Sequence, residues 1–160
     1  SLDLEKLQSN KIWFIIPLIA VVILLVVFWP SGDDDDQIIE CKGSAQCYTG
    51  LVSRIIDGNT IEVDDIRVDL VLVSTPEYGE PGHIEAMTFT RKLCPVGSTV
   101  VVDVDDGSIE VALGRKKGLI TCENTNLNAE LLNSDHAEID TDYCSISEFA
   151  EDSWAKSAGC

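Results

Sequence analysis

The sequence predicts a single transmembrane α-helix followed by an α+β domain, a five-stranded OB-fold β-barrel with about three helices. Three observations point to this class. Residues 12–29 contain no charged side chain, short β-branched runs precede the helical segments with one helix after the third strand, and all six cysteines follow the apolar run. We therefore divide the 160 residues into an N-terminal segment 1–11, a span 12–29, an acidic linker 30–47 and a folded domain 48–160.

The apolar run is long enough to cross a membrane. As an α-helix, residues 12–29 extend roughly 27 Å, close to the hydrocarbon thickness of a bilayer. Trp13 and Trp29 stand near its ends, where aromatic side chains favour the headgroup region. A cleaved signal peptide is the main alternative, but the run is longer than usual and the following Pro30-Ser31-Gly32-Asp33 lacks a small-residue cleavage site. We interpret the run as an uncleaved anchor.

The residues around the anchor predict its orientation. Lys6 and Lys11 precede it and four aspartates, 33–36, follow it, so the positive-inside rule places the N-terminus in the cytoplasm and the domain outside. An even number of cysteines agrees, because it favours disulfides in an oxidising compartment. Zinc is the alternative, but no cysteine pair has the C-x-x-C spacing and both histidines are isolated. The disulfide candidates, whose pairing the sequence leaves open, are Cys41, Cys47, Cys94, Cys122, Cys144 and Cys160.

Hydrophobic periodicity predicts the elements of the domain. Residues 48–56, 60–63 and 66–73 are apolar or alternating and are separated by turn residues, as in a meander of three strands. Residues 82–94 change to a helical period, which stops at Pro95. A strong strand then covers 98–104, weaker strands 110–113 and 119–122 flank a basic turn, a short helix covers 127–133, and a final helix begins after Ser145 or Ser147 and runs to about residue 158.

The charge balance excludes some classes of function. Against 11 lysines and arginines stand 28 acidic residues, and residues 31–160 carry the whole net charge of −17. Lysine and arginine supply the affinity of proteins for nucleic acid backbones, so we do not expect a protein that coats DNA or RNA. Such an acidic surface also repels anionic lipid headgroups and suits a basic partner or a medium rich in divalent cations.

Four short motifs resemble those of the staphylococcal nuclease (thermonuclease) family. Each is weak alone, but they occur together in the family order over residues 48–160. The resemblance implies a five-stranded OB barrel with three helices, and calcium-dependent hydrolysis of phosphodiesters in DNA or RNA. The motifs are Val52-Ser53-Arg54-Ile55-Ile56-Asp57-Gly58-Asn59-Thr60 with Leu70-Val71-Leu72-Val73-Ser74-Thr75-Pro76-Glu77, Glu85-Ala86-Met87-Thr88-Phe89-Thr90-Arg91-Lys92-Leu93, Gly114-Arg115, and Leu127-Asn128-Ala129-Glu130-Leu131-Leu132.

The resemblance assigns catalytic roles to three positions that match the family. In that chemistry two aspartates hold the cation, a glutamate activates or positions the attacking water, and two arginines stabilise the phosphoryl oxygens. Glu77 matches the glutamate and Arg115 one of the arginines, while Thr75 matches the threonine whose carbonyl helps to bind the metal. The structural alternative for each is plain: Glu77 caps a turn, and Arg115 belongs to a solvated hairpin tip.

Other positions depart from the family. Asn59 and Ser74 stand where the two metal-binding aspartates belong, Asp69 replaces the first arginine, and Leu113 replaces the tyrosine before Gly114. Two neutral residues remove two anionic ligands from the cation, and each lost electrostatic stabiliser commonly costs on the order of 10²–10³ in rate. We therefore lean towards a chain that is not an enzyme and needs no cofactor.

A rearranged site is the alternative. Arg67, two residues before Asp69, is positioned to replace the lost arginine, and Asp57, Asp69 and Glu77 are candidate ligands of a calcium ion, together with Asn59 and Thr75. The main hypothesis is a non-catalytic, membrane-anchored accessory subunit of a membrane or cell-surface complex, whose partners are the membrane and other protein subunits. The competing hypothesis is an anchored, calcium-dependent nuclease.

Overall fold

The structure is a computed structural model that describes residues 41–107 and 114–160. The expected span, residues 12–29, lies outside these ranges, as do most of the expected acidic linker, the strand expected at 110–113 and Leu113. In the two described ranges, no helix combines the length and the apolar character that a membrane crossing requires.

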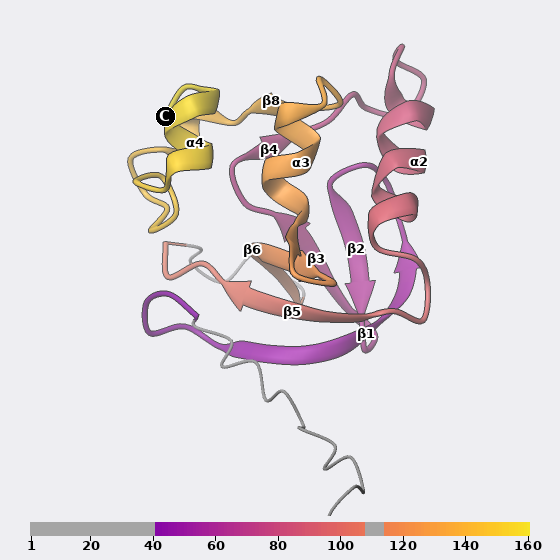
Figure 1. Ribbon diagram of the computed structural model, residues 1–160, viewed down its shortest axis with the longest axis horizontal. Helices are drawn as coiled ribbons and strands as arrows, with labels where there is room; N and C mark the ends of the chain where they lie inside the picture. The colour runs from indigo at the N-terminus through magenta and orange to yellow at the C-terminus, as the bar shows by residue number, and fades with distance from the viewer. Residues whose placement is uncertain (1–40, 108–113) are drawn as a thin grey trace, which may run out of the picture. The chain divides into compact units, whose positions relative to one another are not determined.

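Five strands form a mixed β-barrel, which three helices accompany (Figure 1). The strands pair in the order β3-β2-β1-β5-β6, and every one of these pairings is antiparallel. A parallel pairing of β3 with β6 then closes the barrel. This architecture confirms the expected α+β class. The five strands are β1 (Cys47–Ile55), β2 (Thr60–Val63), β3 (Ile66–Leu70), β5 (Thr99–Val104) and β6 (Arg115–Cys122).

Alternating side chains fill the barrel, as the period of a half-buried strand requires. Ile61, Val63 and Val68 are fully buried, and Val100 and Ile120 from the opposite strands join the same core. The turn between β2 and β3 consists of Asp64 and Asp65, which both have positive φ angles, of 49° and 66°. Two such residues make the tight turn whose twist matches that of a hairpin.

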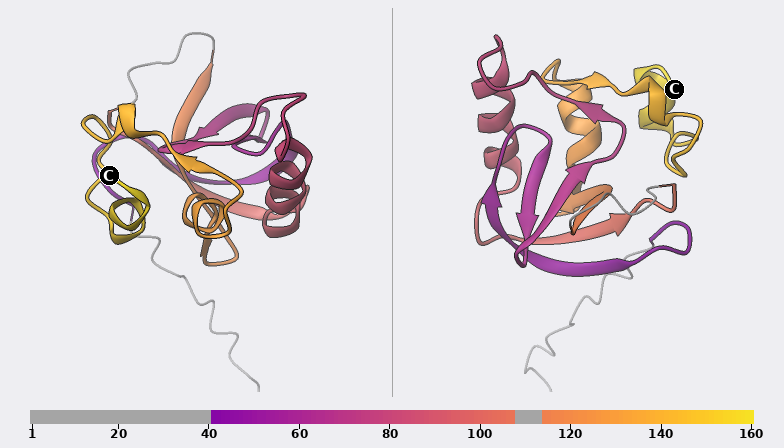
Figure 2. Two further views of the ribbon diagram at one scale, coloured as in Figure 1. Left: turned by 90° about the horizontal axis from the view of Figure 1, so that it is seen from above. Right: turned by 180° about the vertical axis from the view of Figure 1, so that it is seen from behind.

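The three helices lie on the same side of the barrel (Figures 1 and 2). They are α2 (His83–Leu93), α3 (Leu127–Asn133) and α4 (Ser153–Ala158). Helix α3 has the bounds that the sequence predicts and begins at an N-cap, because the Asn126 side chain accepts a hydrogen bond of 3.0 Å from the Ala129 N–H. Its residues Leu127 and Leu131 are fully buried in the barrel core.

Three predicted elements differ from the structure. The third strand ends at Leu70 instead of Val73, because Leu72 has a positive φ of 63° and the chain then begins β4 (Val73–Ser74). The basic turn is part of β6, whose first residues pair with β3. The final helix begins only at Ser153; before it the chain forms β8 (Glu138–Ile139), which pairs with β4, the short helix η1 (Thr141–Tyr143) and a series of turns.

One buried side chain completes the closure of the barrel. Asn128 on α3 is fully buried, and its amide Nδ2 donates to the carbonyls of Val71 (2.9 Å) and Gly118 (3.3 Å). Its Oδ1 accepts a hydrogen bond of 3.1 Å from the Ile120 N–H. Gly118 must be glycine here, since a Cβ would lie 2.5 Å from the carbonyl oxygen of Asp103 on β5.

All six cysteines are paired, which confirms the expectation of disulfides over zinc. The pairs are Cys41–Cys47, Cys94–Cys122 and Cys144–Cys160. The middle pair is completely buried and joins the end of α2 to β6, whereas the other two include exposed residues. Three disulfides in so small a domain indicate an extracytoplasmic compartment. Residues 41–47 belong to the folded domain and not to the expected linker, because a disulfide and strand β1 hold them.

We predict that Asn128→Ala destabilises the domain by about 2–4 kcal/mol, because it leaves the buried Ile120 N–H and Val71 carbonyl without partners. The measurement is equilibrium unfolding of the full chain in detergent with its disulfides intact. Asn133→Ala, at the exposed end of the same helix, is the matched control and should change the free energy of unfolding by less than about 0.5 kcal/mol. Equal effects of the two substitutions would contradict the role of Asn128.

Candidate functional site

The closure of the barrel brings together two side chains that the sequence singled out. The guanidinium Nη2 of Arg115, at the start of β6, donates to both carboxylate oxygens of Asp69 on β3, at 2.9 and 2.8 Å. Thr60 adds a hydrogen bond of 3.1 Å to the same carboxylate. The parallel register explains the encounter: Asp69 lies opposite Lys117, two residues beyond Arg115 on the same strand.

The ion pair has a clear electrostatic effect. The pKa of the Arg115 guanidinium is raised, first by its hydrogen bond to Asp69, then by the negative charge of Asp69, with a further contribution from the charge of Asp57. The Arg115 side chain is 40% exposed and that of Asp69 14% exposed, so the pair is partly screened by water. Arg115 is therefore engaged by a carboxylate at the position where the resemblance would have it meet a phosphate.

The turn between β1 and β2 holds Asp57 and Asn59 close to this pair. The Asn59 amide Nδ2 donates to the carbonyl of Val73 at 2.8 Å, and its backbone N–H donates to Asp57 at 3.1 Å. An aspartate at position 59 could not donate the first of these bonds and would place its charge against a carbonyl oxygen. The amide of Asn59 thus ties the turn to β4.

The same turn is fixed against helix α2. Thr90 donates its hydroxyl to the carbonyl of Gly58 at 2.6 Å, and a Cβ at position 58 would lie only 2.8 Å from the Ala86 methyl group and 2.9 Å from Thr75. A glycine is therefore required by this close approach.

Glu77 is not brought into the ion pair. It lies in the exposed segment before α2, where its backbone N–H donates to Glu80 at 2.8 Å. No hydrogen bond or ion pair of its own carboxylate occurs within residues 41–107 and 114–160. Arg67, the other candidate arginine, lies opposite Arg115 in the strand register. The structure thus assembles Asp57, Asn59, Asp69 and Arg115, and leaves Glu77 at the surface.

The candidate calcium ligands do not have the mutual spacing of a metal site. Across the part of the chain that the structure describes, one group of three potential ligand residues has its ligand atoms within 4.8 Å of one another: Cys41, Cys47 and Asp103. The two cysteines of this group are bonded to each other. Asp57, Asp69 and Glu77 do not form such a group, so a calcium ion would need these side chains to move or would need other ligands.

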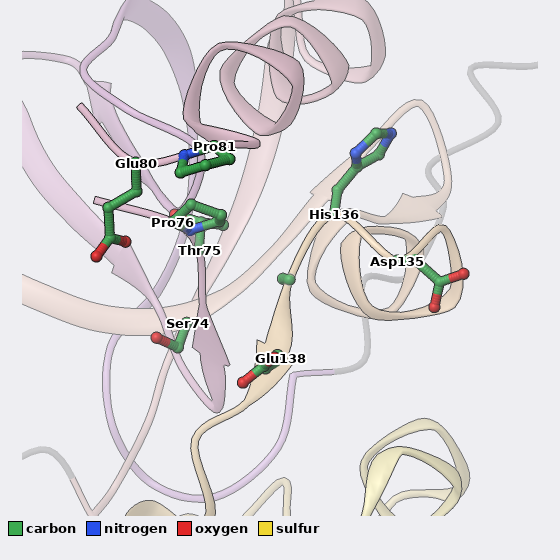
Figure 3. Close-up of a pocket in the computed structure, with 9 residues that line it drawn as sticks. Ser74, Thr75, Pro76, Glu80, Pro81, Asp135, His136 and Glu138 are labelled. Carbon is green, nitrogen blue, oxygen red and sulfur yellow. The ribbon is translucent and has the colours of Figure 1, made fainter. Parts of the chain in front are cut away.

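An open pocket of about 510 Å³ adjoins this region (Figure 3). Figure 3 shows Ser74 on β4 next to Glu138 on β8, with Glu80 before α2 and Asp135 and His136 on the loop after α3. Three carboxylates and no lysine or arginine line the pocket, so it attracts cationic groups and repels phosphates. The lining residues are Ser74, Thr75, Pro76, Glu80, Pro81, Asp135, His136, Ala137 and Glu138.

No local pattern in the sequence signals this pocket, because its lining residues come from two segments, 74–81 and 135–138, that are far apart in the chain. Only the pairing of β4 with β8 brings Ser74 and Glu138 together. The histidines have structural contacts: His136 lies 4.6 Å from the Phe89 ring, and His83 is hydrogen-bonded to the Pro76 carbonyl at 3.1 Å.

No model of a known protein family matches this chain, and no curated protein matches it at a significant level. The chemistry of the site is therefore the basis for assigning a function. Three features make up that chemistry. Arg115 is hydrogen-bonded to Asp69, and an acidic pocket lies beside this pair. Asn59 and Ser74 are neutral at the two positions where the thermonuclease resemblance would place metal-binding aspartates.

We predict a coupling energy of about 1 kcal/mol between Asp69 and Arg115, because the two hydrogen bonds are made by partly exposed groups. The measurement is a double-mutant cycle with Asp69→Ala and Arg115→Ala, followed by equilibrium unfolding. Arg54 and Glu62, an ion pair of 2.7 Å with the arginine 63% exposed, are the matched control and should couple by less than about 0.5 kcal/mol. A coupling near zero for Asp69 and Arg115 would show that the pair does not constrain the arginine.

Proposed function

We propose that this chain is a membrane-anchored, extracytoplasmic domain with a thermonuclease-like OB fold, which binds a protein partner as an accessory subunit and does not cleave nucleic acid. Three features support the proposal. The barrel and its helices have the number that the resemblance implies, the disulfides fit an oxidising compartment, and residues 12–29 have the length and composition of an anchor.

The observation that carries the proposal is the ion pair between Asp69 and Arg115. A phosphate that approached Nη2 of Arg115 would have to displace a carboxylate that makes two hydrogen bonds to that nitrogen. In the nuclease reaction a second arginine would share this work, and here its position holds the carboxylate itself. Each stabiliser of this kind commonly contributes on the order of 10²–10³ in rate.

Asn59 supports the same conclusion independently. Its amide donates to the Val73 carbonyl, which gives the neutral side chain a structural use that an anionic metal ligand could not serve. On this proposal the side chains of Asn59 and Asp69 make contacts within the fold, to the Val73 carbonyl and to Arg115, in place of binding a metal or a phosphate.

The charge of the domain indicates the chemistry of its partner. Residues 31–160 carry a net charge of −17, and the pocket beside β4 adds three carboxylates with no lysine or arginine. Complementary charge guides association and suppresses wrong partners. We therefore propose a partner subunit that presents lysine or arginine to the pocket.

A calcium-dependent nuclease is the second candidate, and one observation favours it. The carboxylate of Glu77 is exposed and has no hydrogen-bond or ion-pair partner in the described ranges, so it is available to position water.

We predict that the purified chain cleaves single-stranded DNA weakly or not at all in millimolar calcium. The reason is the joint presence of Asn59, Ser74 and Asp69, together with repulsion between an acidic domain and a polyanion. The triple substitution Asn59→Asp, Ser74→Asp and Asp69→Arg should raise the cleavage rate if the fold is inherited and only the chemistry is lost.

The control for this assay is Glu77→Gln in both backgrounds. It should abolish any activity gained by the triple variant and leave the wild type unchanged. Strong calcium-dependent cleavage by the wild type that disappears in Glu77→Gln would make the chain an enzyme and reject the proposal.

We also predict that the chain fractionates with membranes and, in mild detergent, elutes in a complex with a protein of complementary charge. Glu80→Gln combined with Glu138→Gln should dissociate the complex at lower salt than the wild type, because the pocket loses two charges. Glu123→Gln combined with Asp142→Asn, at exposed positions outside the pocket, is the matched control and should have no effect. Elution of the full chain alone under every mild condition would contradict an assembly role.

A further inference from the structure

The disulfide between Cys41 and Cys47 lies beside a buried carboxylate. Cys47 is the first residue of β1 and faces Asp103 of β5 in the strand register. A carboxylate oxygen of Asp103 and both sulfurs lie within 4.8 Å of one another. Cys47 is exposed and Cys41 half-buried, so an external thiol can reach the bond.

Asp103 is buried, and one of its two carboxylate oxygens accepts no hydrogen bond from the described residues. The residue is 6% exposed, and its Oδ2 accepts a hydrogen bond of 2.8 Å from the Lys42 N–H. Its other oxygen, Oδ1, is buried and has no hydrogen-bond partner among residues 41–107 and 114–160. A buried polar atom without a partner costs free energy, so its presence in a folded domain calls for an explanation.

Burial, together with neighbouring negative charges, favours a proton on this carboxyl group. The pKa of Asp103 is raised above its ordinary value, first by burial and then by the negative charges of Asp106 and Asp105, while the Lys42 N–H and ammonium group act in the opposite direction. Glu148 faces the same group, and its pKa is also raised, first by burial and then by the charges of Asp106, Asp103 and Asp105. Asp103 thus has a protonated form available closer to neutral pH than an ordinary aspartate does.

The loop closed by the disulfide has other attachments. Asp106 accepts hydrogen bonds from the backbone N–H groups of Ser44, at 2.9 Å, and of Ala45. Together with the bond from Lys42 to Asp103, they hold the loop on β5 independently of the sulfur bond. Reduced cysteines would consequently remain close enough to form the disulfide again.

The other two disulfides of the chain lack this environment. Cys94–Cys122 is buried at 0% and 1% exposure, where thiols in solution have no access. Cys144–Cys160 is accessible to a similar degree as Cys41–Cys47, but within the described residues it has no carboxylate in a comparable three-member group. The same molecule therefore contains two accessible disulfides: Cys41–Cys47, which has the carboxyl group of Asp103 beside it, and Cys144–Cys160, which has no carboxylate in such a group.

We propose that Cys41–Cys47 is a redox-active disulfide that exchanges two electrons with an external dithiol, and that Asp103 is its proton donor. This inference does not depend on the function proposed above. A thiolate of the dithiol attacks Sγ of the exposed Cys47, the bond to Cys41 breaks, and its electron pair goes to Sγ of Cys41, which takes a proton from Asp103. The result is a mixed disulfide between Cys47 and the dithiol.

A second exchange completes the reaction. The other thiol of the dithiol loses its proton to water and attacks its own sulfur partner in the mixed disulfide, which releases Cys47 as a thiolate that water protonates. The external dithiol has then been oxidised to a disulfide, Cys41 and Cys47 have been reduced to thiols, and Asp103 regains its proton from solvent. The reverse sequence oxidises the chain.

The test uses the full chain in detergent, with dithiothreitol as the dithiol, between about pH 4.5 and pH 8.5. Samples are trapped by alkylation, and mass spectrometry of peptides gives the reduction rate of each disulfide. The quantity of interest is the rate at Cys41–Cys47 divided by that at Cys144–Cys160 in the same molecules, because this ratio cancels the thiolate concentration of the reagent. Continued protection of Cys94–Cys122 shows that each variant remains folded.

We expect this ratio to be high at low pH and to fall as Asp103 loses its proton, since an ionised carboxylate cannot donate and also repels thiolates. Asp103→Asn should lower the ratio about tenfold at low pH and make it independent of pH. Asp106→Asn is the matched control: it loosens the same loop and should keep the pH dependence, with the inflection at lower pH because a like charge is gone.

Two results would overturn the proposal. In one, Asp103→Asn has the ratio of the wild type at low pH, which would leave Asp103 a purely structural acceptor. In the other, the wild-type ratio does not change with pH. The second result needs no variant at position 103, so the test is decisive even if Asp103→Asn does not fold.

Discussion

The carboxamide of Asn128 is the contact on which the arrangement of this domain depends. Parallel pairing of β3 and β6 ends at Leu70 and Gly118, and the buried amide continues the hydrogen bonding where the strands separate. An amide suits this place because it donates and accepts at once, whereas a carboxylate or an apolar group would leave buried backbone groups without partners. The same contact anchors α3, whose end leads into β8 and so to one wall of the acidic pocket.

The seam that Asn128 completes also determines the chemistry of the candidate site. With β3 and β6 in this register, Asp69 reaches Arg115 and engages Nη2 of its guanidinium, while the buried Nε has no hydrogen-bond partner among the described residues. On the neighbouring turn, Asn59 gives its amide to a backbone carbonyl. The thermonuclease resemblance would place a metal-binding aspartate at position 59 and a phosphate-binding arginine at position 69. In this chain the Asn59 side chain bonds to a backbone carbonyl and the Asp69 side chain to Arg115, so both contribute to the folded structure.

Local pattern predicted the elements well where one period continued without interruption. The strand at 60–63 and the helix at 127–133 have the expected bounds, because turn residues or a capping asparagine define their ends. The third strand was predicted too long, since nothing in an apolar run signals the positive φ of Leu72. The final helix was also predicted too long, because the buried Asp105 accepts hydrogen bonds from Ser147 and Glu148 and holds these residues in turns. The ion pair of the site joins residues 46 positions apart, so it follows only from the closure of the barrel.

The acidic end of the barrel combines opposing contributions to stability. Asp106 is held by backbone N–H groups that lower its pKa, so its contribution is present at neutral pH and is lost as the pH falls through its folded value. Asp103 and Glu148 have raised pKa values, so they favour the folded state at low pH and this contribution is lost as the pH rises through their folded values. Near neutral pH the domain therefore retains buried like charges that oppose its folding. Asp106 and Asp103 both accept backbone hydrogen bonds from the loop at residues 42–45, but Asp103 uses only one of its two oxygens for this. A second carboxyl group, buried beside an accessible disulfide and with one oxygen unbonded to the described residues, has a physical reason if the sulfur bond opens and requires a proton.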